Sequence, residues 1–87
     1  MKLVLKPIDA LVYFVDRKQP RPYKFRYKDE EGEPHVVVID KVLSVIERNI
    51  PGARSYIFEC QSSNGSFDYR YELKFASDSG QWLLYKI

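Results

Sequence analysis

The stretch that decides the fold runs from Phe67 to Phe75 and reads Phe-Asp-Tyr-Arg-Tyr-Glu-Leu-Lys-Phe. Every odd-numbered residue in it is apolar or aromatic, and every even-numbered residue carries a charge. A period of two over nine residues predicts a β-strand with one face on a core and the other in water. We therefore expect the aromatic rings of this strand to point inward.

The segments on either side of this strand complete a predicted meander. Residues 55–61 alternate in the same way and place Tyr56, Phe58 and Cys60 on one face. The Asn64-Gly65 pair favours a tight hairpin, because both residues tolerate the positive φ that such a turn requires. A polar turn over residues 77–80 then leads into a final strand over residues 82–87. The last three strands should therefore pair in sequence order.

Upstream, the chain contains three further strand-like segments. Residues 8–15 are rich in β-branched and aromatic side chains, which favour strands. Residues 23–28 alternate, so that Tyr23, Phe25 and Tyr27 should share one face and Lys24, Arg26 and Lys28 the other. An acidic turn over residues 29–34 follows. Residues 36–39 are apolar on both faces, which predicts a strand buried from two sides or at the seam of a small barrel.

Residues 40–49 are ambiguous between strand and helix. Apolar residues at 39, 42, 43 and 46 have helical spacing, with Asp40 as an N-cap and Pro51 beyond the end. Against a helix, Val42, Val45 and Ile46 are β-branched and lose side-chain freedom there. A bent or bulged strand is the preferred interpretation, and a short helix is the alternative.

Length and composition predict the number of domains, and the spacing of strands and turns predicts the fold class. The chain has 87 residues, of which 45% are hydrophobic and 30% charged, which is typical of one small globular domain over residues 1–87. Short strands separated by Gly, Pro, Asn and Asp turns predict an all-β fold. We expect a small antiparallel curled sheet or an SH3-like barrel of about five to six strands. The alternative is an α+β fold with one short helix at about 40–49.

Net charge, cysteine content and the length of apolar runs limit the partners and the cellular compartment that we expect. The net charge is +2, which is too mild to imply a polyanionic partner by itself. One cysteine excludes an internal disulfide and fits a reducing cytoplasm. No apolar run reaches the length of a signal-peptide core or of a membrane span. We expect a cytoplasmic protein with no membrane contact.

The residues that carry catalytic chemistry are few. His35 is the only histidine, so a metal site would lack a second imidazole. Cys60 falls on the inward face of a predicted strand, where cysteine usually acts as a small hydrophobe. The acids at residues 29–33 cluster on a turn, and the four glycines are isolated. We therefore expect no enzymatic activity, no catalytic residues, no metal site and no cofactor.

A basic segment over residues 17–28 is the candidate nucleic-acid site. It contains no acid, and aromatic residues are interleaved with its cations, which is the combination that single-strand binders use. In a regular strand, however, rings and cations would point to opposite faces. Nucleic-acid binding is therefore the alternative function, and its candidate residues are Arg17, Lys18, Arg21, Lys24, Arg26 and Lys28.

Protein association is the favoured function. Seven tyrosines, five phenylalanines and one tryptophan exceed what so small a core is expected to cover, which would leave ring surface for a partner. A homodimer through a sheet edge or an aromatic patch, or a complex with an unknown protein partner, follows from this. Trp82 and Tyr85 are the candidate interface residues. The competing interpretation is that Trp82 and Leu84 cap the core.

The C-terminal pattern also carries a resemblance. Tyr71-Glu72-Leu73-Lys74-Phe75, a polar turn and Trp82-Leu83-Leu84-Tyr85-Lys86-Ile87 resemble short uncharacterised bacterial proteins. The likeness reaches back through Phe58-Glu59-Cys60-Gln61 to residues 38–43 and 22–26 and covers about half of the chain. The resemblance implies a compact, barrel-like all-β fold, and it implies no site residue.

Overall fold

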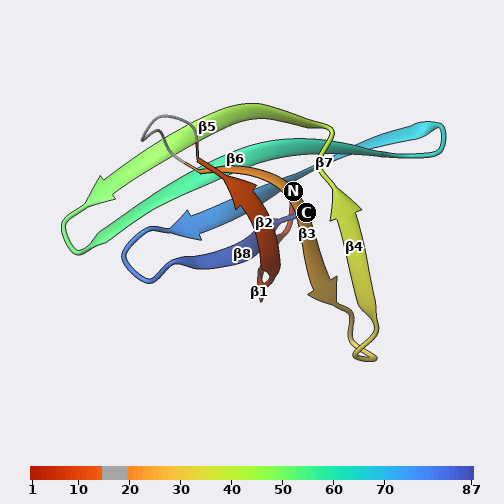
Figure 1. The fold of residues 1–87 in the computed structure, drawn as a ribbon, viewed down its shortest axis with the longest axis horizontal. Coiled ribbons are helices and arrows are strands. Elements are labelled where there is room, and N and C mark those ends of the chain that lie inside the picture. The colour runs from red at the N-terminus through yellow and green to blue at the C-terminus, as the bar shows by residue number, and fades with distance from the viewer. Residues whose placement is uncertain (15–19) are drawn as a thin grey trace.

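A computed structural model of the chain describes residues 1–14 and 20–87. Within these residues the chain forms two antiparallel sheets and no helix (Figure 1). The strands are β1 (Leu3–Pro7), β2 (Asp9–Tyr13), β3 (Arg21–Lys28), β4 (Pro34–Val38), β5 (Lys41–Ile50), β6 (Ala53–Asn64), β7 (Phe67–Ala76) and β8 (Gln81–Lys86). The predicted all-β curled sheet is confirmed. The sheets do not close into a barrel, and the eight strands exceed the expected five to six.

The larger sheet has the strand order β1-β8-β7-β6-β5. It contains the predicted meander, since β6 pairs with β7 and β7 with β8. Gly65 has a φ of 64°, as the tight turn between β6 and β7 requires. The sequence does not predict β1, because Leu3, Val4 and Leu5 are apolar in succession and show no period of two. In the structure, Leu5 has a positive φ and the register with β8 shifts between Leu3 and Lys6.

The smaller sheet has the order β2-β3-β4 and crosses the larger one steeply (Figure 1). The strand predicted over residues 8–15 corresponds to β2, and the end of that prediction lies outside the described residues. The chain passes from β4 to β5 within two residues. The Ile39 N–H donates to the Tyr23 carbonyl at 2.9 Å, and the Asp40 N–H donates to the Gln61 carbonyl at 2.9 Å. These two bonds fix the smaller sheet against the larger one.

The core lies between the two sheets. The smaller sheet contributes Phe25, and the connection between β4 and β5 contributes Ile39. The larger sheet contributes Phe58, Cys60, Tyr71, Leu73, Trp82 and Leu84. Aromatic contacts dominate this core, because the Trp82 ring centroid lies 4.8 Å from that of Phe75 and 5.4 Å from that of Phe58. The predicted inward face of residues 56, 58 and 60 is confirmed.

The helix alternative for residues 40–49 is wrong. β5 occupies this segment and pairs with β6 from Lys41↔Gln61 to Ile50↔Ala53. A register shift between Val42 and Ser44 confirms the predicted bulged strand. The β-branched residues suit this strand, and the apparent helical spacing arises because the strand is exposed along most of its length rather than alternately buried.

Two expectations of burial are also wrong. Phe67 is 77% exposed and Tyr69 is exposed as well, so the alternation of β7 is buried only from Tyr71 onward. The hairpin of β6 and β7 projects past the smaller sheet, so the first residues of β7 have no second layer over them (Figure 1). Val36 and Val38 are exposed because the smaller sheet covers the core with one face only.

The expected alternation of β3 fails at Tyr23. Phe25 is buried and Tyr27 is half-buried, but Tyr23 is exposed while Pro22 is buried. The register with β2 shifts here, from Leu11↔Lys24 to Val12↔Pro22, which leaves Tyr23 as the extra residue of a bulge. Proline has no N–H to give to the ladder, so it is found at bulges and strand starts. Pro22 therefore accounts for the outward turn of Tyr23.

Candidate interaction surfaces

Cys60 lies in the core with none of its surface exposed. Its Sγ donates to the Phe58 carbonyl at 3.6 Å. Burial, followed by the nearby carboxylates of Glu59 and Glu72, raises the pKa of the thiol to about 12. The nucleophilic thiolate is therefore disfavoured at neutral pH.

His35 pairs with a carboxylate on the surface. Its Nε2 lies 2.7 Å from Asp29 Oδ2, and its ring stacks on Tyr27 with centroids 5.1 Å apart. The hydrogen bond from His35, with backbone N–H donors from Glu33 and Glu31, lowers the pKa of Asp29. This pair organises the β3–β4 turn. In residues 1–14 and 20–87, no cluster of three His, Cys, Asp or Glu side chains could hold a metal ion.

Trp82 is not available as an interface residue. It is 8% exposed and packs between Phe58 and Phe75, so the interpretation that it caps the core applies. Tyr85 is half-buried, and the ammonium groups of Lys74 and Lys86 lie 5.5 and 5.3 Å from its ring centroid. Two lysines over the ring leave Tyr85 little free face for a partner.

The outward side of the smaller sheet, here called the outer face, brings exposed apolar and basic side chains together. Residues paired directly across an antiparallel sheet share a face, so Leu11, Lys24 and Val38 form one row and Asp9, Arg26 and Val36 the next. Arg26 and Asp9 make an exposed ion pair at 2.7 Å. Tyr13 and Tyr23, with ring centroids 6.0 Å apart, adjoin these rows.

Two adjoining hollows lie here, one on the outer face and one at its margin, where residues of β1 and of the smaller sheet come together. One, of about 330 Å³, is lined by Asp9, Ala10, Leu11, Lys24, Phe25, Arg26 and Val36. The second, of about 280 Å³, is lined by Lys6, Pro7, Ile8, Asp9, Arg26, Tyr27 and Lys28. They share Asp9 and Arg26 and therefore meet at the ion pair.

The six basic residues that the sequence predicts as a nucleic-acid site fall into three groups. Lys24, Arg26 and Lys28 line the hollows, Arg21 begins β3 opposite Tyr13, and Arg17 and Lys18 lie outside the described residues. The sequence does not point to Lys6, because it lies outside the basic segment of residues 17–28. Its Nζ donates to the Lys28 carbonyl at 3.1 Å, a contact that only the packing of the two sheets creates.

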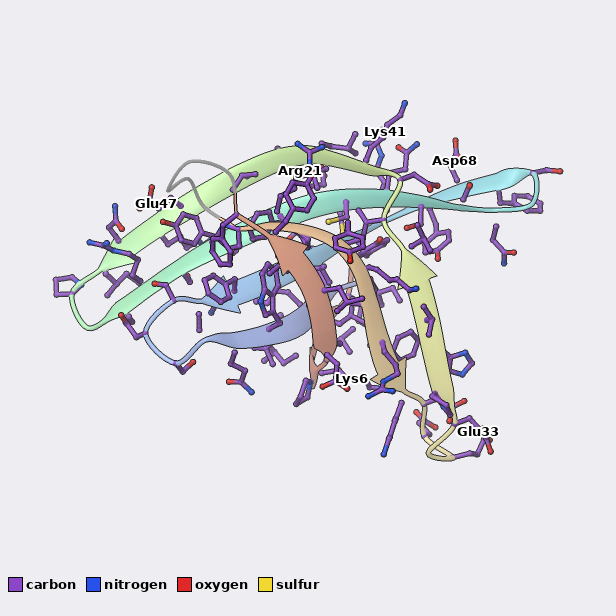
Figure 2. The ribbon with its side chains drawn as sticks, viewed as in Figure 1. Lys6, Arg21, Glu33, Lys41, Glu47 and Asp68 are labelled. Atoms are coloured by element: carbon purple, nitrogen blue, oxygen red, sulfur yellow. The ribbon has the colours of Figure 1, made fainter. Side chains whose placement is uncertain are left out.

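The second candidate surface is the free edge of β5. This ten-residue strand is the outermost member of the larger sheet and pairs with β6 alone among the described strands. Four of its large apolar side chains are exposed, namely Leu43, Val45, Ile46 and Ile50. Figure 2 shows Lys41 and Glu47 at separate points along this strand, with the apolar residues between and beyond them in sequence.

The described residues contain no helix long and apolar enough to cross a membrane. Comparisons of the chain with protein-family models, with curated proteins and with solved structures find no match. Any functional assignment therefore rests on these two surfaces.

Proposed function

We propose that this protein is a non-enzymatic assembly module that forms a homodimer by antiparallel pairing of its β5 edges. The observation that carries the proposal is the length of the unpaired edge. β5 presents ten residues whose outward backbone N–H and C=O groups have no strand partner among the described residues. Such an edge is a template for another strand.

The side chains of β5 favour a protein partner over water. Leu43, Val45, Ile46 and Ile50 leave apolar surface exposed on an edge strand, and burying such surface stabilises association. The bulge between Val42 and Ser44 lies near the start of the strand. The remainder of β5 is regular and can accept a ladder. β1, at the opposite edge of the same sheet, is half as long and irregular, so it is the poorer template.

A second copy of the chain suits this edge because two-fold pairing is self-complementary. In an antiparallel pair related by a two-fold axis, only the residue on the axis faces its own copy. An axis at Val45 or Ile46 places an apolar pair there, and it sets Glu47 and Arg48 opposite other residues. Like charges directly opposite each other are thereby avoided.

The catalytic candidates support the non-enzymatic part of the proposal. Cys60 is enclosed in the core, and His35 and Asp29 form a surface pair at a turn. None of these three residues lines either hollow. A single buried cysteine also supports a reducing compartment, and we place the protein in the cytoplasm.

Size-exclusion chromatography with light scattering, from about 1 μM to 1 mM protein, tests the dimer. We expect the mass to rise from one chain to two with concentration, and Ile46→Lys to hold the protein as a monomer, because the introduced ammonium groups of the two copies would meet near the axis. Leu3→Lys on β1 is the matched control, since Leu3 is 53% and Ile46 54% exposed. A wild-type protein that stays monomeric at 1 mM, or a dimer that only Leu3→Lys disrupts, contradicts the proposal.

A further inference from the structure

We propose that the outer face of the smaller sheet binds single-stranded nucleic acid. The inference goes beyond homodimerisation and depends on other residues, since β5 contributes nothing to this face. It also goes beyond the basic segment seen in the sequence, because the face draws on β1, β2 and β4 as well as β3.

The charge on this face favours an anionic chain. Four cations, Lys6, Lys24, Arg26 and Lys28, line the two adjoining hollows, and Asp9 is their one carboxylate. Asp9 neutralises only Arg26, at 2.7 Å. The Lys6 ammonium is held in place by the Lys28 carbonyl at 3.1 Å and lies 5.5 Å from the Tyr27 ring centroid. Among the described residues, the ammonium groups of Lys24 and Lys28 on the outer face, and of Lys6 at its margin, have no carboxylate partner.

The spacing of the cations along β3 suits a phosphate backbone. Lys24, Arg26 and Lys28 alternate along the strand and are about 6.6 Å apart in succession, which is close to the separation of neighbouring phosphates in an extended strand. Lys24 and Lys28 can each neutralise a phosphate and release its counterions, and Arg26 can do so when it exchanges Asp9 for a phosphate. The outward positions of the row follow from the register with Val38, Val36 and Pro34.

The bulge at Tyr23 supplies stacking surfaces beside the cations. Tyr13 and Tyr23 are each 44% exposed and form a tilted pair with centroids 6.0 Å apart. Nucleobases stack on exposed rings in a way that depends little on sequence. Regular alternation of β3 would have directed Tyr23 to the core, so the bulge removes the geometric objection to a combined basic and aromatic face.

The acidic β3–β4 turn limits the path of the strand. Glu33 lies at one end of the smaller sheet, and Arg21 lies at the other (Figure 2). Exposed charges are screened beyond about 8 Å at physiological salt, so the turn repels phosphate mainly near Lys28. We therefore expect the bound strand to run from Lys28 toward Tyr23, Tyr13 and Arg21. That path follows β3, whose eight residues span about 25 Å.

Fluorescence anisotropy with labelled oligothymidylate and oligouridylate at 20 and 150 mM salt tests the inference. We expect binding at low salt that weakens as salt is added. Lys24→Gln with Lys28→Gln should lower the affinity at least tenfold at low salt and reduce the slope of log affinity against log salt by about 1.4, because each lost phosphate contact removes about 0.7. Tyr23→Ala should weaken binding about tenfold with the slope unchanged.

The matched control is Lys2→Gln with Arg70→Gln, which removes two exposed cations that line neither hollow. It should leave the affinity within about twofold of wild type. Absence of binding at 20 mM salt overturns the inference, as does an equal loss in the control. Duplex DNA that binds as tightly as the single strand also overturns it. Polyglutamate that competes as well as the oligonucleotide, together with a silent Tyr23→Ala, would show an acidic-peptide surface instead and overturn it.

Discussion

The hydroxyl oxygens of Ser62 and Tyr71 lie 2.6 Å apart in the core, on neighbouring strands β6 and β7. Ser62 Oγ also lies 2.7 Å from the Val38 carbonyl, to which it donates. With this donor used, the serine oxygen accepts from the tyrosine O–H. One serine thus joins the last residue of β4 to the larger sheet. The two bonds together give the buried hydroxyls of Ser62 and Tyr71 their partners, as burial requires.

Removing the hydroxyls of Ser62 and Tyr71 separately and together should reveal an energetic coupling between the two residues. We expect Tyr71→Phe to lower the unfolding free energy by about 1 kcal/mol, since Ser62 keeps its bond to the Val38 carbonyl. Ser62→Ala should cost about 2 kcal/mol, because it leaves the buried Tyr71 hydroxyl without a partner. The double variant should cost less than the sum. Urea denaturation of the four proteins measures the cycle, and strict additivity would contradict the shared bond.

The two phenylalanines at Phe58 and Phe67 should differ sharply in importance. Phe58 is buried against Trp82, whereas Phe67 is exposed at the projecting hairpin. We expect Phe58→Leu to lower the unfolding free energy by about 1 to 2 kcal/mol through lost packing. Phe67→Leu should change it by less than about 0.5 kcal/mol. Urea unfolding followed by Trp82 fluorescence compares them, and equal losses would place Phe67 in a packed environment instead.

The sequence predicted the meander because its signals are local. Alternation in β6 and β7 and the Asn64-Gly65 turn each concern neighbouring residues, and the structure confirms the pairing of these strands. β5 was ambiguous because an exposed edge strand has no need to alternate. Burial of Val36 and Val38 was wrongly expected, since apolar composition alone does not reveal whether a second layer covers a strand.

The candidate surfaces were only partly predictable for the same reason. The cations of β3 could be read from one segment, but the contribution of Lys6 depends on how the two sheets pack. The outward position of Tyr23 depends on a bulge, whose one sequence signal is Pro22. Tryptophan suits both a core and a contact surface, so the sequence alone does not separate these two roles for Trp82. Its burial against Phe58 and Phe75 assigns it to the core.

Stability should fall at alkaline pH through Cys60. Burial raises the pKa of its thiol in the folded protein from about 9 to about 12. The unfolded chain then loses this proton at lower pH than the folded protein, so the stabilisation is complete below about pH 9 and is lost as the pH rises toward 12. Cys60→Ala should reduce the slope of unfolding free energy against pH in this range by up to about 1.4 kcal/mol per pH unit.

Urea unfolding at half-unit steps from pH 8 to 11 measures that slope. Ile57→Val is the control, because it alters a buried side chain without removing a titratable group. Its slope should match that of the wild type. At pH 8 the native thiol should also resist a disulfide reagent that modifies it rapidly in urea. Rapid modification of the native protein, or an unchanged slope in Cys60→Ala, would contradict a buried protonated thiol.

Acid should loosen the β3–β4 turn through Asp29. Its carboxylate accepts the N–H groups of Glu31 and Glu33 at 3.0 and 2.9 Å and bonds the ring of His35 at 2.7 Å. Because these bonds lower the pKa of Asp29 in the folded protein, their stabilisation is present above the unfolded value of about 3.8 and is lost as the pH falls below it.

NMR titration should show the Glu31 and Glu33 amide signals shifting together with the Asp29 carboxyl carbon. In Asp29→Asn this concerted acid transition should disappear, whereas Asp68→Asn, a matched change on β7, should preserve it. Amide shifts that persist in Asp29→Asn would show that another group controls the turn.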